Sequence, residues 1–403
     1  MSFIYNNEIK YSDSVNLDAF GRIRMSQITS LLEVSQVYDK RPYIVDEVTG
    51  GTVTSIFDSG NSQVIMSGTG ANSYVIRQTF NTAPYQPGKS QLFEASFGNF
   101  QLQSDVIKRV GQFTSTTAST YNSNFDGYFL ESNGITNVIS FQVWKTGSLT
   151  FSAATTQWNS NEFDPSNITW SLTQLMQVDY QWLGVGRMRF YMIFSGSPYL
   201  MYEHTGTNNL STVYMTSPNK PIRYELKTSG GTGSFNMICS QVSLEGSLNQ
   251  LWIPLGLTHA ETTTLSTSGT KYPWLGIKMN TGYEDISPII QQVSVLNTSN
   301  DDYLVTIEID PTISGSYSFS ATTQPEVLKS LGDGSQTVTS TGAILGSFIG
   351  AAGTSSITSF ELLDSQVNPG KKINGQAQAL WICITPLGAN ATFRGSANIY
   401  YRK

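Results

Sequence analysis

The sequence predicts a mainly β protein, with two β-sandwich or jelly-roll-like domains preceded by an extended N-terminal arm. Charged residues make up only 13% of the 403 residues, roughly half the share of an ordinary soluble domain, and Ser, Thr, Asn, Gln and 35 glycines replace them. These residue types favour turns and extended chain over helix. The 20 tyrosines and 20 phenylalanines suit a pleated sheet surface. Short apolar runs also recur about every ten residues, with glycine-rich turns between them, as in sandwiches and jelly rolls.

Residues 1–50 show little periodicity, and we assign them to the arm. A short helix is expected within it at residues 26–37, because Ser26 could cap apolar residues at Ile28, Leu31 and Leu32.

The first domain is predicted to span residues 51–245. One strand is expected at 138–144, and another near 190, where Phe190, Met192 and Phe194 alternate with the residues between them. Two more strands are expected at 222–226 and 235–239, and the glycine-rich segment 228–233 between them is interpreted as a turn.

The second domain is predicted to span residues 246–403. Its clearest strand is 303–310, in which Tyr303, Val305, Ile307 and Ile309 share one face. Further strands are expected at 379–385 and 397–401, and no repeat of fixed period indicates a solenoid or propeller.

Charge and hydropathy exclude several classes of partner. A net charge of −6 argues against binding duplex nucleic acid, and no run of basic residues is longer than a pair such as Lys108-Arg109. No apolar run is long enough to span a membrane, and the first residues do not form a signal peptide, so synthesis in the cytosol is expected. Cys239 and Cys383 lie in apolar contexts and are expected to be buried free thiols.

Two glycine motifs are interpreted as turns. Gly88-Lys89-Ser90 invites comparison with a phosphate-binding loop, but Ala83 stands where that loop needs glycine, and no helix is predicted after it. Gly184 and Gly186 are not followed by the third glycine of a G-x-G-x-x-G dinucleotide-binding motif. We therefore expect no nucleotide cofactor.

The sequence does not predict a catalytic or metal centre. His204 and His259 have no second histidine at ligand spacing, and Glu203-His204 is expected in a surface loop. A carboxylate pair that cleaves glycans stays open as an alternative, because two acids can meet from anywhere in a fold. The acids considered for it are Asp126, Asp164, Asp179 and Glu203.

Aromatic residues in polar surroundings allow two interpretations. Trp158, Trp274 and Tyr283 could stack on sugar rings, or they could pack in a core or an interface. We favour packing, because aromatic side chains dominate cores and interfaces.

The segment Asp18-Ala-Phe-Gly-Arg-Ile-Arg-Met-Ser26 contains the candidate assembly contacts Asp18, Phe20, Arg22 and Arg24. Phe20 could anchor in an apolar surface, and the two arginines could pair with carboxylates or backbone carbonyls. A segment without periodicity buries little against itself, so we expect it to contact another chain.

This segment resembles the D-A-F-G-R-L-R-V-S opening of a group of virion structural proteins from tailed bacteriophages, with Ile23 and Met25 as conservative departures. Further segments resemble the same group in the same order, and together they cover about residues 18–226. They are YVIRQT at 74–79, YQPGKSQ at 85–91, KRVG at 108–111, DGYF at 126–129, QWLGVGRMRF at 181–190, VYMTSP at 213–218 and PIRY at 221–224.

The resemblance implies a structural component of a phage virion, such as a fibre, spike or capsid-surface subunit. It implies assembly in the host cytoplasm, contacts with other virion proteins and a homo-oligomer, with a trimer favoured by analogy. We expect that the protein is not an enzyme and that it binds no cofactor or metal. A host-glycan binding or depolymerising module of the tail is the alternative.

Overall fold

The computed structural model describes residues 2–5, 8–11, 28–40, 43–115, 124–158, 163–246, 252–351, 356–361 and 368–401. Nearly all regular structure in these ranges is antiparallel β-strand, which confirms the predicted class, and the short 3-10 turns η1 (Thr155–Gln157) and η2 (Pro165–Asn167) are the exceptions. The chain forms two compact units, Met1–Asn249 and Gln250–Lys403. In the described ranges, no helix has the length and hydropathy to cross a membrane.

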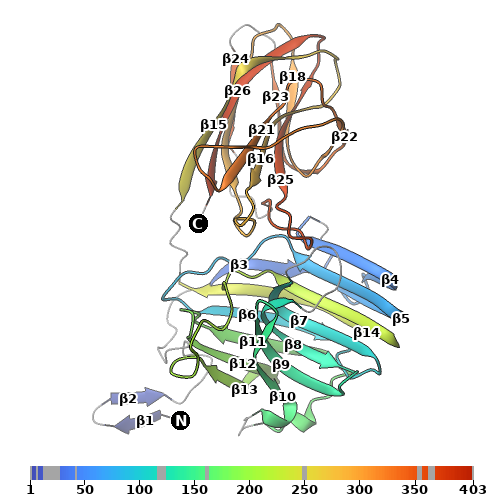
Figure 1. Ribbon diagram of the computed structural model, residues 1–403, viewed down its shortest axis with the longest axis vertical. Helices are drawn as coiled ribbons and strands as arrows, with labels where there is room; N and C mark the ends of the chain where they lie inside the picture. The colour runs from blue at the N-terminus through green and yellow to red at the C-terminus, as the bar shows by residue number, and fades with distance from the viewer. Residues whose placement is uncertain are drawn as a thin grey trace. The chain divides into compact units, whose positions relative to one another are not determined.

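The first unit is a sandwich whose two layers share one long strand, β14 (Ile222–Glu245) (Figure 1). Beside the first part of β14, one layer contains β4 (Val45–Asp58), β5 (Gln63–Thr79), β7 (Val106–Ser115), β8 (Phe125–Asn133), β9 (Val138–Lys145) and β10 (Ser148–Ala154). Beside its last part, the other contains β3 (Ile28–Ser35), β6 (Gln91–Gly98), β11 (Gln174–Tyr180), β12 (Arg187–Phe194) and β13 (Ser197–Thr205). A separate hairpin joins β1 (Ser2–Tyr5) and β2 (Glu8–Tyr11).

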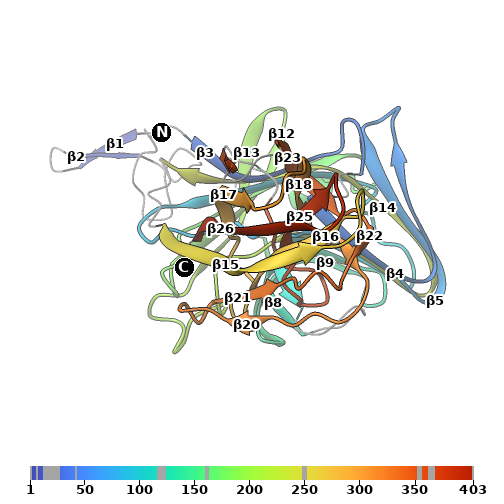
Figure 2. The same ribbon diagram turned by 90° about the horizontal axis from the view of Figure 1, so that it is seen from above.

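The predicted turn at 228–233 is wrong, because β14 runs through this segment as one bent strand of 24 residues. β5 pairs along most of its length, from Gln78 opposite Arg223 to Val64 opposite Met237. The glycines permit a bend with register shifts inside this pairing. Figure 2 shows β4 and β5 alongside β14.

Part of the predicted arm belongs to the sandwich. β3 and the first residues of β4 lie within residues 28–50 and pair with β14 and β5. The expected helix at 26–37 is wrong, because β3 occupies residues 28–35. Leu32 and Val34 alternate into the core, so burial in the sheet outweighs the helical spacing of the apolar residues.

Aromatic side chains join the two layers of the first unit. Phe141 of β9 stacks on Phe190 of β12 with ring centroids 4.8 Å apart. Tyr128 of β8 meets Tyr180 of β11 edge-on at 5.4 Å. Phe190 and Met192 are buried in this core as predicted, and Phe194 packs partly buried against it.

The second unit is also a two-sheet sandwich. One sheet has the order β15 (Ile253–Leu265), β26 (Ala391–Tyr401), β17 (Ile289–Asn297) and β24 (Ser356–Glu361). The other has the order β20 (Ser320–Ala321), β21 (Val327–Leu331), β16 (Tyr272–Met279), β25 (Ala379–Pro386), β18 (Tyr303–Ile309) and β23 (Ala343–Gly350). A further pair joins β19 (Thr312–Ile313) and β22 (Val338–Ser340).

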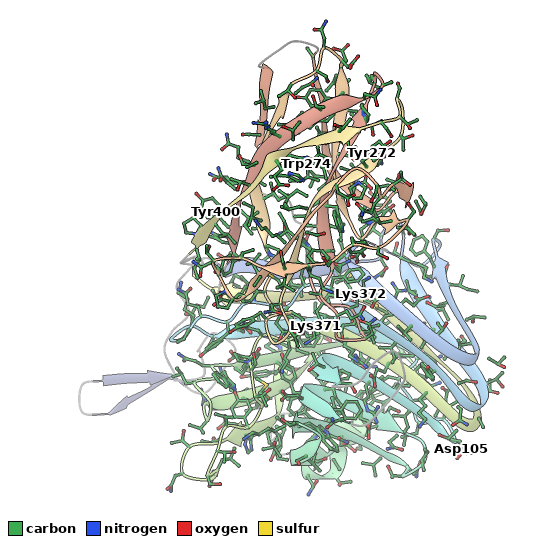
Figure 3. The ribbon with its side chains drawn as sticks, turned by 45° about the horizontal axis from the view of Figure 1, so that its top comes forward. Asp105, Tyr272, Trp274, Lys371, Lys372 and Tyr400 are labelled. Carbon is green, nitrogen blue, oxygen red and sulfur yellow. The ribbon has the colours of Figure 1, made fainter. Side chains whose placement is uncertain are left out.

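The core of the second unit confirms the predicted strand near residue 303. Tyr303, Val305, Ile307 and Ile309 of β18 are all buried in it. Trp274 of β16 is fully buried in the same core and lies inside the unit in Figure 3.

Candidate functional site

The candidate assembly contacts Asp18, Phe20, Arg22 and Arg24 lie outside the described residues, and their role stays a prediction. Three of the seven other segments in the phage resemblance contribute to one group of polar side chains in the first unit, all of them buried except the half-buried Tyr85. We call this group the polar cluster. Its members are Tyr85, Gln91, Gln112, Asp126, Tyr128, Tyr180, Tyr214 and Lys220.

Asp126, the second residue of β8, attaches the 213–221 connection to the sandwich. Its Oδ1 accepts the backbone N–H of Thr216 at 3.0 Å, and its Oδ2 lies 3.0 Å from Nζ of Lys220. The Thr216 hydroxyl donates to the same Oδ2. Asp126 and Lys220 are both buried, so each charge depends on the other for compensation.

Buried tyrosines use their hydroxyls to fix neighbouring strands. Tyr180 donates to Oε1 of Gln91 at 2.6 Å, and Nε2 of Gln91 donates to the carbonyl of Pro84 at 3.0 Å. Tyr128 donates to Oε1 of Gln112, whose Nε2 donates to the carbonyl of Lys220 at 3.3 Å. Burial raises the pKa of Tyr128 and Tyr180 well above the ordinary value, so both hydroxyls stay neutral donors.

The two glycine motifs border this cluster as turns, as predicted. Gly88 has φ +87°, and the N–H of Lys89 donates to the carbonyl of Gln86 at 3.2 Å; strand β6 follows where a phosphate loop would need a helix. Gly184 has φ +82°, and its carbonyl accepts the N–H of Tyr214 at 3.1 Å. The Tyr85 hydroxyl accepts the N–H of Leu183 at 3.2 Å.

A second polar group crosses the face of β14, β7 and β8 that is turned away from the core. We call Arg223, Glu225, Arg109 and Glu131 the charged row. Arg223 Nη2 lies 2.6 Å from Oε1 of Glu225, whose Oε2 lies 3.0 Å from Nη1 of Arg109. Arg109 Nε then lies 2.7 Å from Oε2 of Glu131. All four side chains are buried, with two positive and two negative charges.

Amide and aromatic groups complete the charged row. Arg223 donates to Oε1 of Gln78 on β5 at 2.8 Å, and Gln142 on β9 donates to Oε1 of Glu131 at 3.1 Å. The Arg109 guanidinium lies 4.5 Å from the centre of the Phe125 ring, within a cluster that also contains Phe113, Phe129 and Trp144. The row therefore links five strands, β5, β14, β7, β8 and β9, through side chains.

The charged row was missed by the sequence analysis. Arg223 and Glu225 alternate within a strand, which places both on one face, and this spacing was the available signal. Their partners Arg109 and Glu131 come from strands more than 90 residues earlier in the chain, so the pairing could not be read from the sequence.

The four acids considered for glycan cleavage each have a structural partner. Asp126 pairs with Lys220, Asp179 forms a fully buried ion pair with Arg189, and Glu203 lies 3.4 Å from Arg187. Asp164 caps η2 by accepting the N–H of Ser166 at 2.9 Å. In register, Asp179 and Glu203 lie on either side of Arg189 in the neighbouring strands β11 and β13.

The expected surface-loop position of His204 is wrong, because His204 lies on strand β13 and its side chain is half-buried. The ring stacks on Phe151 with centroids 3.6 Å apart and meets Tyr214 edge-on at 6.3 Å. Burial lowers the pKa of His204 to about 4, because the charged imidazolium is poorly solvated there.

We expect this histidine to make the first unit sensitive to acid. Between pH 6.5 and about 4 the unfolded chain binds a proton at His204 that the folded chain does not, so stability should fall as the pH falls through this window. His204→Gln should reduce that fall, measured as the change in urea midpoint between pH 7 and pH 4. An equal fall in both proteins would contradict this assignment.

The remaining candidates take packing roles in the described residues. Trp158 and Trp274 are buried, which confirms the favoured interpretation for both, and Tyr283 packs partly buried against the second core. Cys383 is buried and Cys239 is half-buried. His259 is buried with its ring stacked 5.1 Å from that of Trp274. In the described ranges, no three His, Cys, Asp or Glu side chains are grouped to hold a metal ion.

Comparisons with known proteins add structural neighbours only. No protein-family model matches the chain, and no curated protein matches it in sequence. A β-glucanase of Bacillus licheniformis is 13% identical with a TM-score of 0.35, and covers 54% of this chain and 99% of its own. Arcelin-5, a lectin-like defence protein of Phaseolus vulgaris, is 10% identical with a TM-score of 0.36, and covers 55% and 100%. A glycoside hydrolase family protein from Mycobacterium thermorestibile is 12% identical with a TM-score of 0.37, and covers 53% and 99%. Likeness at this level does not bear on function.

Proposed function

We propose that this chain is a structural component of a bacteriophage virion, a fibre, spike or capsid-surface subunit that assembles through the segment around Asp18–Ser26. The observation that supports the proposal is the ordered series of segments that resemble those of phage structural proteins. Several of these segments supply the polar cluster: YQPGKSQ supplies Tyr85 and Gln91, DGYF supplies Asp126 and Tyr128, and VYMTSP supplies Tyr214. The shared residues thus include ones that hold the first unit together, as expected if the resemblance reflects a common framework.

In this proposal the chain assembles with copies of itself and with other virion proteins, and it does not act as an enzyme. The partnered state of Asp126, Asp164, Asp179 and Glu203 supports a structural role for these acids. A chain poor in charge also approaches copies of itself without strong repulsion.

The test is the double variant Phe20→Ala with Arg22→Ala in phage particles. We expect its copy number per particle to fall at least about tenfold, because truncating an interface anchor often costs about 2 kcal/mol or more. Quantitative mass spectrometry of purified particles measures this, and circular dichroism checks the fold.

Tyr38→Ala is the matched control, since Tyr38 is 84% exposed and is not part of the shared segment. Wild-type incorporation of a folded double variant would contradict the role of the segment, and absence of the wild-type chain from particles would contradict the virion assignment. In parallel, purified protein should leave host polysaccharide intact; turnover lost on changing one acid would favour a depolymerase.

A further inference from the structure

Strand β23 forms one edge of the six-stranded sheet in the second unit, next to β18 (Figure 1). Its sequence, Ala343-Ile-Leu-Gly-Ser-Phe-Ile-Gly350, contains neither a charged residue nor proline. Ile344 is 53% exposed and Ile349 is 71% exposed. A long, apolar edge strand of this kind is a template for pairing with another strand.

Other edge strands of both units carry features that block such pairing. β13 contains Pro198 and Glu203, and β15 contains Pro254 and Glu261. β3 contains Glu33, β24 ends in a glutamate, and β20 has only two residues. Charges, proline and short length are the usual protections of a sheet edge.

At the two remaining edges of the sheets with four or more strands, other parts of the chain form hydrogen bonds with the edge strand. On β4, the carbonyl of Ser55 accepts Nζ of Lys40 at 2.7 Å. On β10, the hydroxyl of Thr150 donates to the carbonyl of Tyr214 at 3.0 Å, from the connection that follows β13. β23, by contrast, has eight residues and contains neither a charged residue nor proline.

The residues of β23 are also symmetric about the centre of the strand. Reading outward from Gly346 and Ser347, the pairs are Leu345 with Phe348, Ile344 with Ile349, and Ala343 with Gly350. Each pair is alike in size or polarity.

The orientations of the side chains follow the same symmetry. Leu345 and Phe348 pack against the core, whereas Ile344 and Ile349 are exposed. A bulge opposite Ile307 and Glu308 brings both isoleucines to one face despite their odd spacing.

We propose that β23 pairs antiparallel with β23 of a second copy of this chain about a two-fold axis. In that arrangement Ile344 of one copy lies directly opposite Ile349 of the other on the same face. The partner is a second copy because the strand is its own complement in residue class and carries no charge that would repel itself. This pairing does not depend on the proposed virion role.

The first test is sedimentation of the full chain. Wild type should form a dimer, and Ile349→Lys should raise the dissociation constant at least about tenfold, because two equivalent isoleucine contacts are lost per dimer. Ile135→Lys is the matched control, since Ile135 is 53% exposed in the turn between β8 and β9. A monomer at about 100 µM, or an equal loss in the control, would overturn the proposal.

The second test checks the register by disulfide formation in a Cys239→Ser background. Ile344→Cys and Ile349→Cys proteins should cross-link when mixed and oxidised, because these positions are opposite across the axis. Each protein alone should cross-link much less, because the same residue of the two copies lies at opposite ends of the paired strands. Equal cross-linking in separate and mixed samples overturns the register. A trimer that remains intact in the Ile349→Lys protein overturns self-pairing. An Ile349→Lys protein that is no longer incorporated into particles but self-associates like wild type also overturns it.

Discussion

Glu225→Leu should lower the free energy of unfolding of the first unit by about 3–5 kcal/mol, the cost of breaking a buried ion pair from one side. Glu225 is fully buried and is the shared acceptor of Arg223 and Arg109. Leucine would fill much of the volume but would leave Arg223, among the described residues, with the amide oxygen of Gln78 as its hydrogen-bond acceptor. Urea unfolding followed by tryptophan fluorescence measures the change.

Glu203→Leu is the control for this variant. Its partner Arg187 is 3.4 Å away, and both side chains are partly exposed, so we expect a loss of about 1 kcal/mol or less. Equal losses in the two variants would mean that the charged row contributes no more than a surface pair.

Gly127→Ala should destabilise the first unit by roughly 2–6 kcal/mol, the sum of backbone strain and overpacking. Gly127 has φ +130°, and a Cβ there would lie 2.3 Å from the backbone oxygen of Gln112 and 2.6 Å from Cα of Phe113. These are backbone atoms of the paired strand β7, so the clash cannot be relieved by rotating a side chain. The urea midpoint and the yield of folded protein measure the effect.

Gly196→Ala separates the two contributions. Gly196 also has positive φ, +77°, but a Cβ there meets nothing within 4 Å. Its expected cost is therefore the conformational part alone, about 1–2 kcal/mol. If Gly127→Ala costs no more than Gly196→Ala, then β7 and β8 separate easily and the close approach at Gly127 has little energetic weight.

The fold class and the strands that have one clearly apolar face could be predicted from local sequence patterns. Apolar residues at every second position of 303–309 and 187–194 are a local signal, because one face of a strand must leave water whatever its neighbours are. The turns at Gly88 and Gly184 were predictable for the same reason, since positive φ selects glycine locally. The assembly role of Asp18, Phe20, Arg22 and Arg24 rests on the sequence alone.

Which strands pair with one another and which charges meet depends on contacts between distant parts of the chain. Residues 228–233 have turn composition, yet β5 pairs along both sides of them and makes one bent strand. Residues 28–35 have apolar residues at helical spacing, yet pairing with β14 makes them a strand. The charged row joins residues up to 116 positions apart, and the exposure of β23 depends on which strand ends its sheet. Long-range pairing supplies the partners and excludes water, and neither is encoded in the spacing of residues along the chain.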